Sequence, residues 1–115
     1  MQEDLRVTIE EVGELSVARV EGELDSQTSH QLLIPLEKAL AEGERRVVID
    51  LGRCTFVDSG GSRAIGLTAR DGSGAPIGIA CPPENRRVMM VLELVGLADL
   101  MEVRPSVEAF LHGDW

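Results

Sequence analysis

Aromatic residues and cysteines are scarce in this sequence. Its 115 residues include no tyrosine, two phenylalanines and one tryptophan, which leaves no aromatic platform for stacking nucleic-acid bases. Two cysteines, Cys54 and Cys81, are too few for a secreted disulfide framework and lack the Cys-x-x-Cys spacing of zinc or redox sites. We expect ordinary reduced thiols; whether their Cα atoms come within the roughly 7 Å needed for pairing is left open.

Basic residues are also in the minority, with 11 Lys and Arg against 20 Asp and Glu and a formal net charge of −9. This balance argues against nucleic acid and against an anionic membrane surface as partners, because both attract clusters of Lys and Arg. The sequence has no apolar run of about 18 residues, and residues 1–4 do not begin a signal peptide. We therefore expect a cytoplasmic protein, with no direct membrane insertion, that binds a protein partner.

The length and an apolar content of 43% predict a single domain over residues 1–115. Apolar residues alternate over 5–9 and 15–20 on either side of Gly13, as in a hairpin with one buried face. Residues 47–51 are almost continuously apolar, which indicates a central strand covered on both faces, and residues 77–81 form a second such strand. A short strand is expected over 100–103.

Helical patterns separate these strands. Capping groups at 25–28 precede Leu33, Leu36 and Leu40 at helical spacing, with a bend or restart at Pro35 and an end at Gly43. A weak helix is expected over 62–70, followed by a loop over 71–74. A stronger helix contains Val88, Val91, Leu92 and Val95 and ends at Gly96, and a last helical turn spans 105–111. The order β-β-α-β-α-β-α-β-α predicts an α/β fold with a mixed sheet and right-handed crossover helices.

The segment from Asp58 to Gly61 carries the most information about function, since it places Ser59 at a strand-to-helix turn. The same four residues, Asp-Ser-Gly-Gly, surround the nucleophile of chymotrypsin-like proteases, so acyl transfer must be weighed. Those proteases are all-β proteins of about twice this length, whereas this chain offers only His30 and His112, both expected at the surface. We expect no enzymatic activity.

Other site patterns are weak. Neither histidine has a second ligand at a suitable spacing, so no metal site is predicted. The acidic pairs Glu10 and Glu11, and Glu21 and Glu23, are best explained as solvated faces rather than catalytic carboxylates. The glycines at 72, 74 and 78 match neither the dinucleotide nor the P-loop spacing, so no cofactor is expected.

Three blocks of sequence together resemble the STAS domain of bacterial anti-sigma-factor antagonists. They span residues 22–25 (Gly-Glu-Leu-Asp), 47–61 (Val47 through Gly61) and 91–97 (Val-Leu-Glu-Leu-Val-Gly-Leu). The blocks follow the family's order at about its spacing and cover nearly the whole chain. The resemblance implies a non-enzymatic STAS fold.

The resemblance also implies partner switching. In that family an anti-sigma factor with serine kinase activity phosphorylates the first serine of the motif, which is Ser59 here. The unphosphorylated antagonist binds the anti-sigma factor and frees a sigma factor, and a metal-dependent serine phosphatase reverses the modification. The family's acidic residue after the second strand matches Asp25, and Asp58 matches the first motif position, so both are expected near Ser59.

Two departures from the family pattern affect this interpretation. Gly60 replaces the usual second Ser or Thr, and Ser62 and Arg63 replace an apolar and a small residue on the surface expected to bind the partner. Gly60, Gly61 and Gly66 lower helix propensity by about 1 kcal/mol each, so a short second helix is expected. On position alone, Asp58 or Ser59 could simply cap that helix.

Two alternatives to the switch therefore stay open. One is a phosphorylation-independent STAS scaffold, such as an accessory subunit of a transport or lipid-trafficking complex. The other is small-ligand binding, which fold analogy alone supports.

Overall fold

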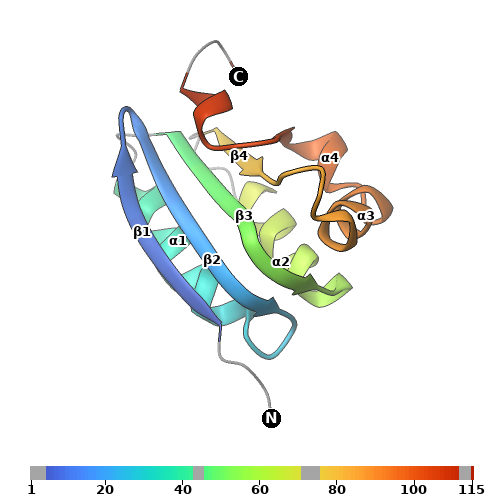
Figure 1. The fold of residues 1–115 in the computed structure, drawn as a ribbon. Helices are drawn as coiled ribbons and strands as arrows, with labels where there is room; N and C mark the ends of the chain where they lie inside the picture. The colour runs from blue at the N-terminus through green and yellow to red at the C-terminus, as the bar shows by residue number, and fades with distance from the viewer. Residues whose placement is uncertain (1–4, 43–45, 71–75, 112–114) are drawn as a thin grey trace.

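One five-stranded sheet organises the computed structural model, which describes residues 5–42, 46–70, 76–111 and 115 (Figure 1). The strand order is β1-β2-β3-β4-β5; β1 is antiparallel to β2, and the remaining neighbours are parallel. The predicted mixed α/β sheet is confirmed. The strands are β1 (Arg6–Val12), β2 (Leu15–Leu24), β3 (Arg46–Val57), β4 (Ile77–Ala80) and β5 (Glu102–Arg104).

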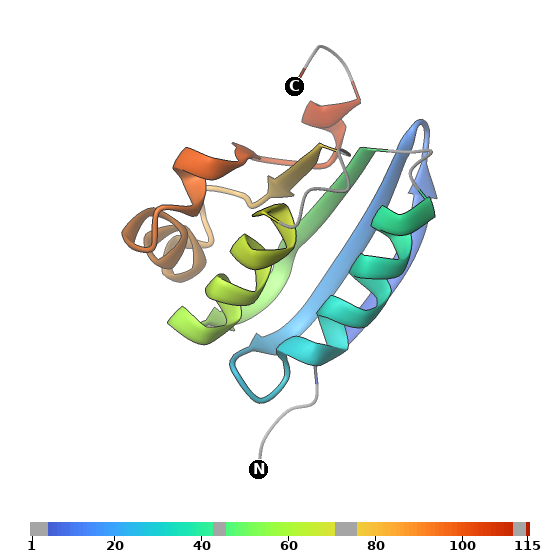
Figure 2. The ribbon, with the colours of Figure 1, turned by 180° about the vertical axis from the view of Figure 1, so that it is seen from behind.

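The crossover helices between the parallel strands pack on one side of the sheet, where α1 and α2 lie next to each other (Figure 2). Right-handed crossovers between strands added in one direction bring their helices to the same face. The short final helix η1 packs on the other face. The helices are α1 (Ser29–Glu42), α2 (Ser59–Arg70), α3 (Arg86–Leu94), α4 (Leu97–Leu100) and the 3-10 turn η1 (Glu108–Phe110).

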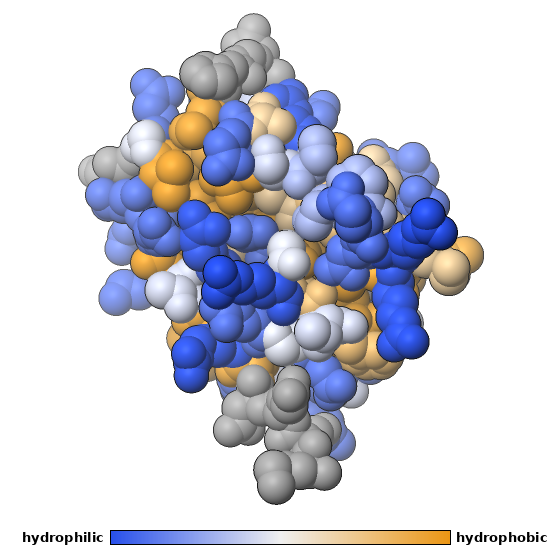
Figure 3. All heavy atoms as spheres, viewed as in Figure 1, coloured by the Kyte–Doolittle hydropathy of each residue, from blue (hydrophilic) through white to orange (hydrophobic). Residues whose placement is uncertain are grey.

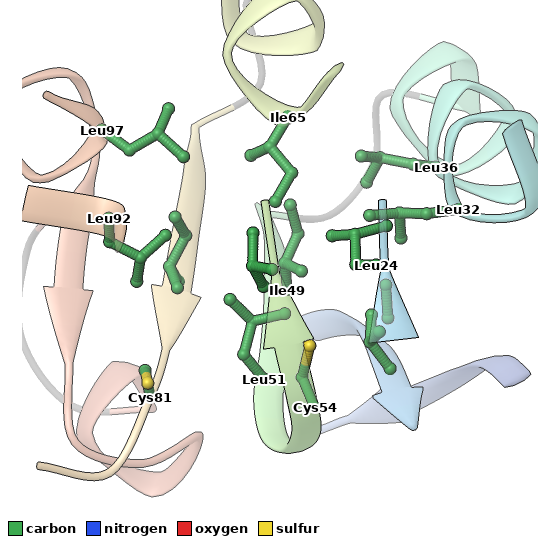
Figure 4. Close-up of a cluster of buried hydrophobic side chains, with 14 of the residues drawn as sticks. Leu24, Leu32, Leu36, Ile49, Leu51, Cys54, Ile65, Cys81, Leu92 and Leu97 are labelled. Carbon is green, nitrogen blue, oxygen red and sulfur yellow. The ribbon is translucent and has the colours of Figure 1, made fainter. Parts of the chain in front are cut away.

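The core has two parts because alternate strand residues point to opposite faces. On the helical side, Ile49 and Leu51 of β3 meet side chains from α1, α2, α3 and α4 (Figure 4). On the opposite side, Val48 packs in a smaller cluster around Phe110. The prediction that this strand is covered on both faces is therefore confirmed for residues 47–49.

Asp50, the charged residue in that strand, lies on the face without crossover helices. One carboxylate oxygen accepts a hydrogen bond from Arg19 at 2.7 Å, and the other accepts from the Gly52 backbone N–H at 2.9 Å. Arg19 also pairs with Glu10 at 2.7 Å. Hydrophilic side chains cover the middle of this face in Figure 3. This part of the face is therefore a solvated surface with ion pairs and is not covered by a layer of helices.

The strands differ from the sequence prediction mainly in the length of β3. The predicted strand covered only residues 47–51, but residues 52–57 continue β3 to Val57 and pair with the end of β2 through two register shifts. These irregularities explain why the strand pattern is hard to see in the sequence. Gly13 provides the hairpin turn as predicted, at a positive φ of 57°.

Several helix predictions need correction. Leu32 rather than Leu33 is buried with Leu36 and Leu40, and α1 runs through Pro35 without a restart. Helix α2 begins at Ser59, three residues before the predicted start, and spans 12 residues. Helix α4 was not predicted, and the final strand begins two residues later than expected, at Glu102.

Other helix predictions agree with the structure or fall outside its described part. Gly96 adopts a left-handed conformation (φ 79°) after α3, as predicted for a helix terminator. The predicted end at Gly43 and loop over 71–74 lie outside the described residues.

Candidate functional site

The candidate site lies at one edge of the sheet, where the parallel strands β2 and β3 both end (Figure 1). The Asp58 backbone N–H donates to the Leu24 carbonyl at 3.2 Å. This bond ties the first residue after β3 to the last residue of β2. The β2–α1 loop and the beginning of α2, each predicted from the sequence, are therefore neighbours.

Asp58 caps α2. Its Oδ1 accepts a hydrogen bond from the Gly61 N–H at 2.8 Å, and its backbone carbonyl accepts from the Ser62 N–H at 3.0 Å. A carboxylate in this position satisfies an otherwise unpaired N–H group and favours the positive end of the helix dipole. Of the two residues considered as caps, Asp58 has this role.

Ser59 follows directly as the first residue of α2, and its side chain is exposed. Its hydroxyl makes no hydrogen bond to any residue in the described part of the chain. The hydroxyl is thus available at the surface, which a phosphoryl acceptor requires. The fold does not need it as a cap.

Two glycines bring α2 close to the strand end and to the preceding loop. A Cβ atom on Gly61 would lie 2.5 Å from the Leu24 carbonyl oxygen, and one on Gly60 would lie 2.8 Å from Cβ of Ser26. Neither position has space for a side chain in this arrangement. The absence of a second Ser or Thr at position 60 therefore goes together with close packing of the β2–α1 loop against α2.

Asp25 organises that loop through its side-chain carboxylate. Its Oδ1 accepts hydrogen bonds from the N–H groups of Gln27 and Thr28, both at 2.9 Å. The Thr28 hydroxyl in turn donates to the Glu23 carbonyl at 2.9 Å and accepts from the Asp25 N–H at 3.0 Å. Asp25 and Thr28 therefore form a reciprocal cap before α1, and the sequence prediction of capping groups in this loop is correct.

Ser59 also lies at the end of a surface groove of 420 Å³ between α2 and the segment that contains α4. Among the described residues that line the groove, Arg63 has the one charged side chain. Leu67, Val95 and Leu100 supply exposed apolar surface there. The sequence did not reveal the groove, because the four-residue helix α4 gave no recognisable pattern. The lining residues are Ser59, Ser62, Arg63, Gly66, Leu67, Val95, Leu97 and Leu100.

The two residues predicted to contact the partner differ in accessibility. Arg63 is exposed and makes no ion pair within the described residues. Ser62 is fully buried, and its Oγ atom has no hydrogen-bond partner in the described structure. The prediction that Ser62 contacts a partner is therefore wrong for this conformation, because α2 turns its side chain inward, into the wall of the groove.

The remaining candidates form no catalytic arrangement within the part of the chain that the structure describes. His30 is exposed on α1, as expected, and His112 lies outside the described residues. Within the described ranges, no group of three or more His, Cys, Asp and Glu side chains could hold a metal ion. None of the helices in those ranges is both long and apolar enough to cross a bilayer.

Cys54 and Cys81 are free, buried thiols in the helical-side core (Figure 4). Burial raises the pKa of the Cys54 thiol. Burial, with smaller contributions from Cys54 and Asp50, raises the pKa of Cys81 to about 11. Thiols of this kind are poor nucleophiles at neutral pH, which agrees with the expectation of ordinary reduced cysteines.

Known proteins are similar to this chain in sequence or in architecture. A candidate anti-sigma factor antagonist, BtrV, of Bordetella bronchiseptica is 29% identical over 105 residues, covering 91% of this chain and 90% of that protein. The crystal structure of an anti-sigma factor antagonist from Mycobacterium paratuberculosis has a TM-score of 0.79 at 22% identity and covers 96% of each chain. The Bacillus cell fate determinant SpoIIAA in its phosphorylated form has a TM-score of 0.62 at 24% identity, covering 91% of this chain and 96% of that one.

A family model provides the assignment. The model described as "Mlab, STAS domain" matches residues 7–103, which contain the whole candidate site and all five strands except the terminal residues Arg6 of β1 and Arg104 of β5. The match agrees with the resemblance noted in the sequence blocks around Asp25, Ser59 and Gly96. This chain belongs to the STAS domain family.

Proposed function

We propose that this protein is a non-enzymatic anti-sigma-factor antagonist that is switched by phosphorylation of Ser59. In the unphosphorylated state it binds an anti-sigma factor with serine kinase activity, and a sigma factor is released. That kinase phosphorylates Ser59 and so ends the complex, and a metal-dependent serine phosphatase restores it. The exposed, unbonded hydroxyl of Ser59 beside the Asp58 cap is the observation that carries the proposal.

The relatives support this assignment. Three comparisons of high coverage are with proteins described as anti-sigma factor antagonists or, for SpoIIAA, as a cell fate determinant solved in a phosphorylated form. The motif around Ser59 lies at the start of α2, on the exposed edge where β2 and β3 end. A kinase can reach a side chain in this position without unfolding the domain.

The charge of a phosphate would matter strongly here. Phosphorylation adds about −1.5 to −2 charges at neutral pH. The beginning of α2 tolerates an anion through its helix dipole, but the Asp58 carboxylate already occupies the Gly61 N–H. The added charge therefore lies at the exposed start of α2, where a partner surface packed over Ser59 would desolvate it at a cost.

The proposed partner surface combines Ser59 with the groove beside it. Leu67 and Leu100 offer exposed apolar contact area, and Arg63 offers a cation in a chain of net charge −9. Apolar contact with a polar rim is the usual composition of a protein interface. We assign Arg63 to this surface, and we assign Ser62 only a place in its wall.

Intact-mass measurement tests the phosphorylation directly. The protein is incubated with ATP and each candidate anti-sigma kinase of its own organism, as wild type, Ser59→Ala and Ser26→Ala. Ser26 is a matched control because it is exposed and lies against Gly60. We expect one added phosphate in the wild type and in Ser26→Ala, and none in Ser59→Ala.

No modification by any kinase would overturn the switch and favour the phosphorylation-independent scaffold. A stable complex with membrane transport subunits that is unaffected by Ser59→Ala would support that alternative. A phosphate retained in Ser59→Ala would move the modification to another residue.

A further inference from the structure

Arg63 stands in an unusual position relative to Ser59. The two residues are four apart in α2, both are exposed, and both line the same groove. On a helix surface such residues have Cβ atoms about 5–6 Å apart. Helical side chains also lean toward the N-terminus, which favours an Arg63 side chain placed over the turn that carries Ser59.

Near Ser59, the groove contains a cation without an ion pair and a hydroxyl without a hydrogen-bond partner among the described residues. Arg63 makes no ion pair with the described residues, and the Ser62 hydroxyl in the groove wall is fully buried without a partner. Helix α2 itself contains no acidic residue, and the Asp58 carboxylate that caps it already accepts the Gly61 N–H through Oδ1. A phosphate on Ser59 therefore adds negative charge beside the Asp58 carboxylate and needs a cation, which Arg63 can supply.

We infer that Arg63 is the intramolecular counter-ion of phosphorylated Ser59. The guanidinium binds phosphate oxygens across one helical turn, in the favourable order with the anion N-terminal to the cation. When phosphorylated Ser59 binds Arg63, the positive charge of Arg63 is neutralised and the phosphate adds negative charge to the groove. Both changes occur in the same step. Arg63 thus stabilises the phosphorylated state, in addition to its proposed place on the partner surface of the unmodified protein.

This inference rests on the proposed function for its biological use, but it can be tested without any kinase. Phosphoserine is incorporated at position 59 by genetic encoding, and the phosphate is titrated by 31P NMR in otherwise wild-type protein, in Arg63→Gln and in Arg87→Gln. Arg87 is a matched control because it is exposed on α3 and is not among the groove-lining residues. Failure of kinase recognition therefore leaves this measurement intact.

A nearby cation favours the dianionic phosphate and so lowers its second pKa, which is ordinarily near 6. We expect the pKa of phosphoserine 59 to be lower with Arg63 present than in Arg63→Gln by roughly 0.3 pH unit, the size of an exposed i, i+4 ion pair. Arg87→Gln should match the wild type. The difference should also shrink in 1 M NaCl, where the Debye length is only about 3 Å.

Equal phosphate pKa values in wild type and Arg63→Gln would overturn the inference. An equal shift in Arg87→Gln would also overturn it, because the effect would then belong to the overall charge rather than to a local pair. Because Arg63 is exposed and unpaired among the described residues, Arg63→Gln is expected to fold. A backbone amide spectrum that changes only around α2 verifies this.

Discussion

At the scale of single residues, the structure divides two tasks between neighbours in the sequence. Asp58 caps α2, and Ser59 presents its hydroxyl to solvent. The sequence alone left open which of the two was the cap, since both residue types cap helices well. The geometry assigns the stabilising role to Asp58, and Ser59 is left free for the proposed modification.

This division predicts different consequences for stability at the two positions. Asp58→Ala should lower the free energy of unfolding by about 1 kcal/mol, because the Gly61 N–H loses its acceptor. Asp58→Asn should retain most of the stability, since an amide oxygen can accept the same hydrogen bond. Ser59→Ala should be nearly neutral. Urea unfolding of the three variants measures these differences, and a larger loss for Ser59→Ala than for Asp58→Ala would contradict the assignment.

Ser62 gives a second prediction at this scale. Its buried hydroxyl lacks a hydrogen-bond partner among the described residues, and such a group costs about 1–3 kcal/mol relative to a satisfied or apolar one. Ser62→Ala should therefore leave the urea midpoint unchanged or raise it. The conservative control Thr68→Ala should lower it, because the Thr68 hydroxyl donates to the Ala64 carbonyl at 3.0 Å. A clear fall in the midpoint for Ser62→Ala would show that the hydroxyl is satisfied in solution.

At the scale of elements, the length of α2 differs from the length that its sequence predicted. Its glycines predicted a short helix, yet it spans 12 residues from Ser59 to Arg70. Gly61 lies against the Leu24 carbonyl oxygen, so tertiary packing requires the glycine that local propensity disfavours. No local pattern reports a contact with a strand end 37 positions earlier along the chain.

Two glycines of α2 should consequently respond differently to alanine. Gly61→Ala places a Cβ atom 2.5 Å from backbone oxygen and should destabilise the protein by roughly 1–3 kcal/mol. Gly66→Ala places one 3.3 Å from the Cδ2 atom of Leu97, which can adjust, and gains up to about 1 kcal/mol of helix propensity. Thermal unfolding compares them. Equal melting temperatures for the two variants would refute the packing argument.

The sequence predicted elements best where residue patterns are long and regular. The hairpin around Gly13, the strand at residues 77–80 and the end of α3 at Gly96 were all correct. It failed where contacts between elements decide the outcome: residues 52–57 extend β3 through irregular pairing, and α4 is too short for a periodic signal. The groove, formed partly by α4, was missed for the same reason.

At the scale of the whole molecule, the sheet has two chemically distinct faces. Helices cover one face, while ion pairs such as Arg19 with Asp50 occupy part of the other. The proposed site lies at the edge between strands and helices, so it uses the rigid sheet for position and the surface of α2 for access. The core residues, in contrast, keep their titratable thiols away from solvent.

Those thiols predict the behaviour of the domain at alkaline pH. Burial raises the pKa of Cys81 from 9.0 to about 11, so the unfolded chain loses the thiol proton first as pH rises. The contribution of Cys81 to stability should therefore be complete below about pH 9 and decline as pH approaches 11. The chain has no tyrosine and one lysine, Lys38, so few other groups titrate in this window; the buried Cys54 thiol, whose pKa is also raised, contributes with the same sign.

Thermal unfolding between these pH values measures the effect. The melting temperature of the wild type should fall over this window, and that of Cys81→Ala should fall less steeply, whatever its value at neutral pH. Lys38→Gln provides a control for the lysine. Identical slopes for wild type and Cys81→Ala would contradict the predicted role of burial.

In the proposed switch, one phosphate on Ser59 controls partner binding. The most direct measurement is the affinity of the anti-sigma kinase identified by intact mass for the protein with serine, alanine or encoded phosphoserine at position 59. We expect serine and alanine to bind alike and phosphoserine to bind at least tenfold more weakly, a loss of about 1.4 kcal/mol. Equal affinity for the serine and phosphoserine forms would contradict the account.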